Sequence, residues 1–153
     1  MSLDLNTTAF QHQKEIPEKF TCKGADRSPE LAWTGVPEGT KSFALIMDDS
    51  DAPAGTWVHW VAYNIPVSVT QFHEDMPKDG ELKDGTRQGK NDFGKLGYNG
   101  PCPPPGIKHR YYFRLYALDA KFDLKPGATR LELDRAMAHK VIGKAELMGK
   151  FKR

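Results

Sequence analysis

Proline and glycine divide this chain into short pieces, and this division limits the folds open to it. The 153 residues include 11 prolines and 14 glycines, distributed along the whole length. Because proline removes a backbone N–H and both residues disfavour helix interiors, this spacing leaves little room for long helices. The apolar runs between the breaks are short and rich in β-branched and aromatic residues, which is typical of strands. The sequence therefore predicts a mainly β fold.

Six segments are predicted to be strands and one to be a helix. Residues 42–47 form a nearly continuous apolar run, which favours a central strand buried on both faces. The helix is predicted to begin after Thr129, which forms a capping-box pattern with Glu132, and to end near Gly143. Residues 73–91 are charged and are predicted to form a surface loop. The predicted strands are residues 3–10, 31–33, 42–47, 57–64, 111–118 and 146–151.

Length and composition favour one domain that covers residues 1–153. With 22 basic and 20 acidic residues, the formal net charge is +2, which gives no electrostatic case for a nucleic-acid partner. No stretch approaches the ~20 apolar residues of a transmembrane segment. The first ten residues lack the layout of a secretory signal, so we expect a cytoplasmic location.

The two cysteines, Cys22 and Cys102, match no metal-ligand spacing and are too few for a disulfide framework. Both lie in loop-like sequence and could be neighbours in space. Because reducing compartments disfavour disulfides, two thiols are favoured over a bridge.

Two short segments about fifty residues apart carry the polar side chains of a candidate site. The first, DSDAPAGTWVHW, covers residues 49–60, and the second, GPCPPPGIKHRY, covers residues 100–111. Alternation along an extended chain places Asp49 and Asp51 on one side and Asp48 on the other. Acidic turns of this kind often only cap their own backbone amides, so these carboxylates become candidates only together with the histidines of the two segments.

Each segment contains one histidine, at a point where an apolar strand begins or runs. A single strand histidine is usually a half-buried structural residue, but His59 and His109 together, near a carboxylate turn, favour a site. Alternation predicts that Tyr111 shares a face with His109, and that Arg110 points the other way, toward Asp48. Both Trp57 and Trp60 are predicted to face away from His59, although Trp57 could still reach the pocket rim from the loop end.

Several kinds of chemistry could use such a pocket. A hydrolase lacks support, because the chain has no G-x-S-x-G elbow and no activated nucleophile. Two histidines with aspartate would suit Zn²⁺ or Fe²⁺, but no metal-binding spacing supports that site. Phosphate-binding glycine motifs of nucleotide enzymes are absent. Imidazolium, tyrosine hydroxyl and loop N–H groups can donate to an anion, while aspartates could hold a histidine protonated or receive a ligand ammonium group.

At these residues the chain resembles the phosphatidylethanolamine-binding protein (PEBP) family, and in particular its prokaryotic, Raf kinase inhibitor-like branch. The resemblance extends over residues 20–33, 49–60, 89–94 and 100–111 and the C-terminal helix and strand. It implies a β-sandwich with Greek-key connections, one or two short peripheral helices, and a small anion pocket at one end. It implies no cofactor and no metal. By motif position, it implies a ligand site composed of Asp49, Asp51, Pro53, His59, Gly100, Pro101, His109 and Tyr111.

The function we expect is therefore non-enzymatic binding of a small phosphate-containing anion or a phosphoethanolamine-type ligand, such as a phospholipid head group. An alternative is a signalling module that inhibits a kinase or protease through the pocket loops. The resemblance also allows a homodimer.

Overall fold

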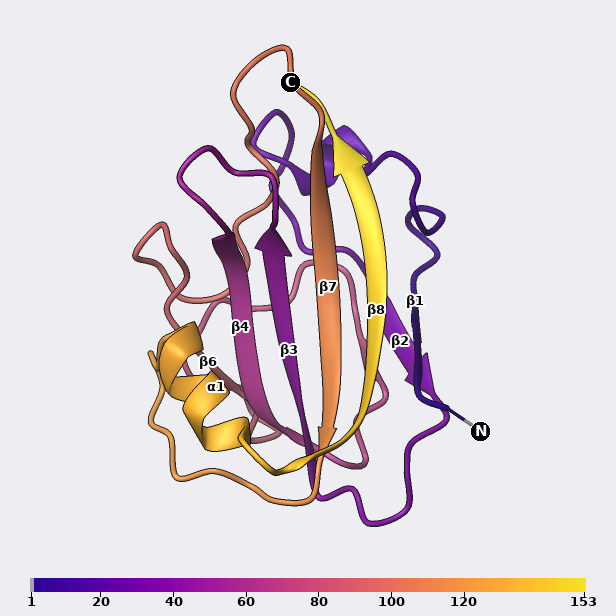
Figure 1. Ribbon diagram of the computed structural model, residues 1–153, viewed down its shortest axis with the longest axis vertical. Helices are drawn as coiled ribbons and strands as arrows, with labels where there is room; N and C mark the ends of the chain where they lie inside the picture. The colour runs from indigo at the N-terminus through magenta and orange to yellow at the C-terminus, as the bar shows by residue number, and fades with distance from the viewer. Residues whose placement is uncertain (1) are drawn as a thin grey trace.

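A computed structural model describes residues 2–153 and contains two antiparallel sheets with one short α-helix, as Figure 1 shows. The five-stranded sheet has the order β6-β4-β3-β7-β8, and the three-stranded sheet the order β1-β2-β5. The predicted β-sandwich with one or two short peripheral helices is confirmed. The strands are β1 (Asp4–Asn6), β2 (Leu31–Thr34), β3 (Ser42–Asp49), β4 (Trp57–Pro66), β5 (Gln71–Phe72), β6 (Arg87–Gln88), β7 (His109–Leu118) and β8 (Val141–Phe151).

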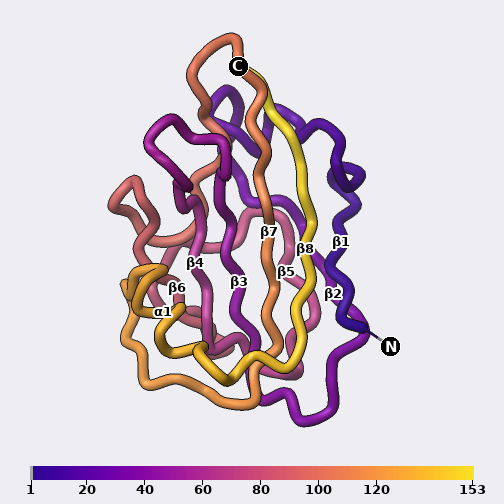
Figure 2. Tube along the Cα trace, viewed as in Figure 1, coloured from indigo at the N-terminus to yellow at the C-terminus, as the bar shows by residue number. Residues whose placement is uncertain are grey.

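Strand β3 is the centre of the large sheet, as its apolar run predicts. All eight of its residues are buried, and it pairs with β4 on one side and β7 on the other. One face of β3 packs against the small sheet, which lies beside and behind β8 in Figure 2. The core between the sheets includes Leu5, Trp33, Phe43, Leu45, Phe72 and Phe113.

The opposite face of the large sheet packs against α1 (Arg130–Met137). As predicted, Thr129 Oγ1 accepts a hydrogen bond from the Glu132 N–H, and the Glu132 carboxylate accepts from the Thr129 N–H. The residues buried between the helix and the sheet include Leu133 and Met137 from the helix and Ala44, Ile46 and Val61 from the sheet. Burial of this second face explains why β3 has no polar alternation.

The helix ends earlier than predicted, at Met137 instead of near Gly143. His139 has a positive φ of 64°, which turns the chain out of the helix. The β-branched Val141 and Ile142 then join β8, so this strand begins five residues before the predicted residue 146. A Cβ at Gly143 would lie 2.7 Å from Pro37 Cγ, so this glycine allows close packing and is no helix cap.

Further elements differ from the sequence prediction, among them β5, which no predicted strand covers. The strand predicted at residues 3–10 is only β1, and the predicted surface loop at 73–91 contains β6. A 3₁₀ turn, η1 (Glu18–Phe20), was not predicted. Within residues 2–153, no helix is long and apolar enough to span a bilayer.

A disulfide joins Cys22 and Cys102, so the expectation of two thiols was wrong. The Cys22 N–H donates to the Pro101 carbonyl at 3.1 Å, which brings the two loops together. The resulting Cα–Cα distance is 5.4 Å, within the usual range for a bridge. The expectation rested on a cytoplasmic location, and this bridge is of a kind more common in oxidising compartments.

Candidate functional site

A cavity of about 370 Å³ lies at one end of the large sheet. Because β3 is antiparallel to both neighbours, β3 ends where β4 and β7 begin, and the C-terminus also reaches this end (Figure 1). Of the predicted site residues, the cavity is lined by Asp49, Pro53, His59 and His109. Asp51, Gly100, Pro101 and Tyr111 lie around or beneath it.

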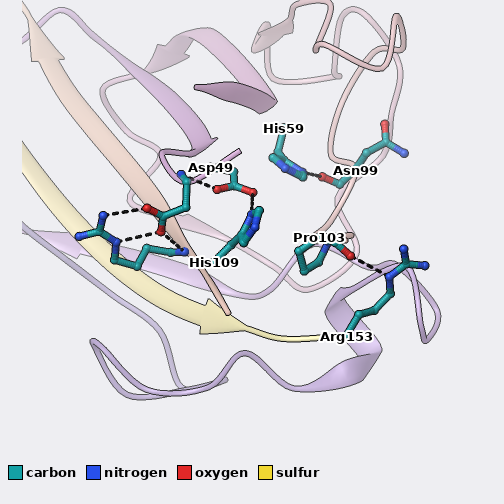
Figure 3. Close-up of polar contacts among 8 residues, drawn as sticks. Asp49, His59, Asn99, Pro103, His109 and Arg153 are labelled. Carbon is teal, nitrogen blue, oxygen red and sulfur yellow. Dashed lines mark hydrogen bonds and ion pairs between the residues drawn. The ribbon is translucent and has the colours of Figure 1, made fainter. Parts of the chain in front are cut away.

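Asp49 and His109 form a buried pair. The Asp49 Oδ2 atom lies 2.7 Å from His109 Nδ1, as Figure 3 shows. The other carboxylate oxygen accepts the Asp51 N–H at 2.8 Å. Both side chains are almost fully buried, with exposed fractions of 6% and 3%. Both Asp49 oxygens are engaged by the protein, so the carboxylate is held in place and orients the imidazole. Since Asp49 holds Nδ1, the other ring nitrogen of His109, Nε2, is left on the cavity side.

His59 is held in a different way, by the backbone. Its Nδ1 lies 2.6 Å from the Asn99 carbonyl oxygen (Figure 3). A carbonyl oxygen only accepts hydrogen bonds, so Nδ1 carries the proton, and Nε2 of the neutral ring is an acceptor. Burial lowers the pKa of His59, against the opposing effects of the Asn99 hydrogen bond and the Asp49 charge. The site thus contains two imidazoles with different partners.

A β-bulge in β4 explains where the His59 side chain points. Met47 pairs with Trp60 and Asp48 pairs with Val58, so His59 is an extra residue in this strand. Bulges of this kind re-aim side chains and are common beside functional sites. Here the bulge puts His59 and Trp60 on the same side.

The prediction that both tryptophans face away from His59 was therefore wrong. Trp57, two residues before His59, lines the same cavity, and Trp60 packs in the core between the sheets.

The loop at residues 89–94 supplies a part of the site that sequence reasoning did not assign. Asn91 is buried and donates to the His59 carbonyl and to Asn99 Oδ1. Asp92 accepts the Val58 N–H at 2.7 Å, next to the bulge. This loop places Phe93 against His59, with ring centroids 5.2 Å apart. The signal for it was the G-x-N-D-F-G motif, which the family resemblance includes without a role.

Phe93 and Trp57 form an aromatic rim on the cavity. Their rings meet edge to face with centroids 5.5 Å apart, and they are 40% and 36% exposed. This contact gives the cavity a wall that is apolar and open to solvent.

The opposite wall is a proline-rich loop at residues 101–105. Gly100 and Pro101 do not line the cavity; they attach the loop to residues 20–26. The Gly100 N–H donates to Asp26 Oδ1 at 2.9 Å, and a Cβ at Gly100 would come within 2.1 Å of the Phe20 carbonyl oxygen. The next residues, Cys102, Pro103 and Pro104, line the cavity itself.

The C-terminus also supports this wall. Arg153 Nε donates to the Pro103 carbonyl oxygen at 2.8 Å (Figure 3). The wall is thus tied to the rest of the molecule at both ends.

Tyr111 lies beneath the two histidines. Its ring centroid is 5.4 Å from that of His59 and 6.5 Å from that of His109, and its side chain is fully buried. Burial, with the charge of Asp49 nearby, raises the pKa of the Tyr111 hydroxyl well above its usual range. Within residues 2–153 this hydroxyl has no hydrogen-bond partner. Tyr111 therefore supports the imidazoles from below.

Asp51 and Arg110 form the outer edge of the site. Arg110 donates to Asp51 from its backbone N–H, Nε and Nη2 at 2.8–2.9 Å. These hydrogen bonds lower the pKa of Asp51 to about 2, mainly through the Arg110 side chain. The predicted pairing of Arg110 with Asp48 was wrong, because Asp51 binds Arg110 in the turn and Asp48 binds Arg114 and Arg130.

The arrangement suits the binding of a small molecule. No group of three or more His, Cys, Asp or Glu side chains within residues 2–153 is placed to hold a metal ion. The cavity offers two ring nitrogens at its base and apolar walls above them, which is the usual composition of a small-molecule site.

The chain is similar to known proteins over nearly its whole length. The family model described as phosphatidylethanolamine-binding protein matches residues 6–152. A UPF0098 protein from Methanothermobacter thermautotrophicus is 51% identical over 151 residues, which cover 99% of each chain. A UPF0098 protein from Aquifex aeolicus is 47% identical over 153 residues, with 99% of this chain and 89% of that protein covered.

Two solved structures share the whole fold. A phosphatidylethanolamine-binding protein homologue from Chlamydia trachomatis has a TM-score of 0.90 and 38% identity, covering 99% of this chain and 98% of that one. Escherichia coli YbcL, described as a new member of the mammalian PEBP family, has a TM-score of 0.93 and 33% identity, with 100% and 99% covered. The matches extend over the whole domain and its site, and the chain belongs to the phosphatidylethanolamine-binding protein family.

Proposed function

We propose that the cavity binds a small phosphate-class anion, free or as a phosphomonoester such as phosphoethanolamine, without transforming it. Family membership supports a ligand-binding role. The observation that carries the proposal is the buried Asp49–His109 pair, whose ring presents Nε2 to the cavity. When His109 is protonated, Nε2–H donates to the anion, and Asp49 offsets the imidazolium charge from behind the ring.

The two aspartates are compatible with an anion because their oxygens are already engaged. Asp49 contacts His109 and the Asp51 N–H, and Asp51 contacts Arg110. Neither carboxylate needs a ligand ammonium group as its partner. An anion held by His109 therefore meets compensated charges at the base of the cavity.

The apolar walls favour an anion that carries an organic group. Trp57 and Phe93 form one side, and Pro103 and Pro104 the other. Contact with an alkyl or aromatic substituent would bury apolar surface on both sides, worth roughly 25 cal/mol per Å². A phosphomonoester should therefore bind more tightly than inorganic phosphate.

We also propose that the protein does not catalyse a reaction of the bound anion. Among residues 2–153, no serine, threonine or lysine lines the cavity, and the cysteine that does, Cys102, is in the disulfide. Inhibition of a kinase or protease, a homodimer and a cytoplasmic location stay predictions from the sequence.

Calorimetry with inorganic phosphate and O-phosphoethanolamine tests the proposal. We expect both ligands to bind, and His109→Ala to weaken both by about tenfold or more, since it removes a charge-assisted hydrogen bond. His73→Ala is a matched control, because His73 is exposed and its side-chain hydrogen bond within residues 2–153 is to the Glu74 carbonyl. Unchanged affinity in a His59→Ala, His109→Ala double variant would overturn the proposal.

A further inference from the structure

The two histidines of the cavity present opposite hydrogen-bonding characters to a ligand. Each is anchored through Nδ1, His59 by a carbonyl oxygen and His109 by a carboxylate. Within residues 2–153, neither Nε2 atom has a hydrogen-bond partner. Neither atom is among the fully buried polar atoms, so both are open to the cavity. Because both residues line the same cavity, both Nε2 atoms are available to one ligand.

His59 is the acceptor of the two. The Asn99 carbonyl requires the proton on Nδ1, and near-complete burial, with 2% exposure, disfavours a second proton. His109 lies against the Asp49 carboxylate, so it can carry protons on both nitrogens without an uncompensated charge. A ligand that satisfies both rings must donate one hydrogen bond and accept another.

We propose that His59 makes the cavity selective for the protonated monoanion of a phosphomonoester. The P–OH group donates to His59 Nε2, and a charged oxygen of the same group accepts from His109 Nε2–H. This assignment rests on the proposed function and adds to it the protonation state of the ligand. An oxyanion without a proton offers only acceptors, so one oxygen would face the His59 lone pair and leave it unsatisfied.

Several charged or titratable groups surround the pair. From β3 these are Asp48 and Asp49; from β7, Arg110 and Tyr111; and from the loops, Asp26, Asp51 and Asp92. Asp51 is paired with Arg110 and Asp48 with two arginines. Tyr111 is held in its neutral form by burial. Their net effect on two monoanions of the same shape should be nearly equal, so a comparison of such ligands isolates the P–OH group.

Methyl phosphate and methyl sulfate are such a pair. Both are tetrahedral and carry one methyl group, and near pH 6 about half of the methyl phosphate is the monoanion, because the second pKa of a phosphomonoester is about 6. Methyl sulfate has no acidic proton. Trp57 reports binding through its fluorescence, because Trp33 and Trp60 are buried and Trp57 lies on the cavity.

At pH 6 we expect methyl phosphate to bind about tenfold more tightly than methyl sulfate, the usual value of a hydrogen bond to a charged partner. At pH 8, where the phosphate monoanion is a minor species, the tighter binding of methyl phosphate should be lost. The His109 Nε2–H donates to both monoanions alike, so the ratio at pH 6 isolates the P–OH group. A ratio near one at pH 6 would overturn the selectivity and leave the proposed function intact. Failure of both ligands to bind would overturn the proposed function as well.

Substitutions at His59 and His109 test the acceptor role of the first and the donor role of the second separately. In His59→Asn the amide N–H₂ can still donate to the Asn99 carbonyl, but the Nε2 acceptor is lost. We expect methyl phosphate to bind about tenfold more weakly and methyl sulfate to bind as before. His109→Asn should weaken both ligands and preserve the ratio. His73→Asn, at an exposed position, should change neither.

The tautomer has a direct test that needs no variant. Nitrogen–proton correlation NMR of the histidine rings should show the His59 proton on Nδ1 and none on Nε2. A His59 ring that carries its proton on Nε2 would contradict the assignment, whatever the affinities.

Discussion

Asp48 and Asp49 are neighbours in β3, yet they serve two faces of the sheet with different partners. Asp48 faces α1 and is bound by Arg114 and Arg130, with Nε and Nη1 at 3.0 and 2.8 Å from its Oδ2. Asp49 faces the cavity and is bound by His109. Both are almost fully buried, so burial alone does not distinguish them.

The partner decides what each carboxylate can do. A guanidinium is charged at every physiological pH, so the Asp48 cluster is a permanent ionic contact between β3, β7 and α1. The imidazole of His109 has a second ring nitrogen, Nε2, on the cavity side, so the Asp49 pair can act on a ligand. The comparison predicts that the Asp48 face stabilises the fold and that the Asp49 face binds the ligand.

The largest expected effect is on stability, from Asp48→Asn. Removing one partner of a buried ion pair costs about 3–5 kcal/mol. Arg114 and Arg130 are about one quarter exposed and keep second partners in Glu146 and Asp134, so we expect the lower end of this range, about 3 kcal/mol. Urea unfolding measures the loss of unfolding free energy. Affinity for O-phosphoethanolamine should be unchanged at temperatures where the variant is folded, and a parallel loss of affinity would contradict the division between the faces.

The disulfide lies on the same side of the molecule as Asp49, because Cys102 lines the cavity. Its removal therefore tests the role of the cavity face. Cys22 and Cys102 are 80 residues apart in sequence. A disulfide typically contributes about 2–4 kcal/mol to the free energy of unfolding. Because Cys102 lies in the proline-rich wall, we expect a dithiol reductant to lower both stability and ligand affinity.

A Cys22→Ser, Cys102→Ser variant is the matched control for this experiment. These are the two cysteines of the chain, so the variant should be insensitive to reductant and should resemble the reduced protein. Full ligand affinity in the reduced protein would show that the bridge does not hold the wall.

Asp49→Asn should have the opposite balance from Asp48→Asn. The substitution keeps the shape of the side chain, so we expect a loss of about 1.5–3 kcal/mol in unfolding free energy, the range for a hydrogen bond to a charged group. Ligand affinity should fall by about tenfold or more, because the His109 imidazolium loses its counter-charge. Calorimetry and urea unfolding on the same preparation test both parts. Ligand affinity equal to that of the unsubstituted protein would overturn the role of the pair.

The Asp49–His109 contact was predictable from the sequence because it depends on regular pairing. Alternation put Asp49 on one face of β3 and both His109 and Tyr111 on one face of β7, and antiparallel pairing brought these faces together. The capping box of α1 was predictable for a similar reason, since it depends on residues three positions apart.

Other parts of the site depend on departures from regular pairing or on distant loops. The bulge at His59 exists only because β4 places one more residue than β3 in the ladder, which alternation within β4 does not reveal. Phe93 and the disulfide depend on how loops far apart in sequence meet. Arg110 and Arg114 both lie on the Asp48 face by alternation, and only the turn at Asp51 decides which of them reaches Asp48.

The smallest expected effect comes from Asp51, which belongs to neither face. Arg110 lowers the Asp51 pKa from 3.8 to about 2, so the folded state binds this proton less readily than the unfolded state. The resulting stabilisation is present above pH 4 and is lost as the pH falls through about 2. Because solvent screens the pair, we expect less than about 1 kcal/mol.

Asp51→Asn should therefore lower the unfolding free energy slightly at pH 6, and the difference from the unsubstituted protein should shrink below pH 4. Urea unfolding at pH 6, 4 and 2.5 tracks this difference, with the exposed Asp123→Asn as a matched control of equal charge change. Ligand affinity at pH 6 should change by less than about twofold, because the Asp51 oxygens bind Arg110 and do not line the cavity. A larger loss of affinity would mean that the whole acidic turn, and not Asp49 alone, contributes to ligand binding. The different roles of Asp48 and Asp49 would then not be explained by their partners alone.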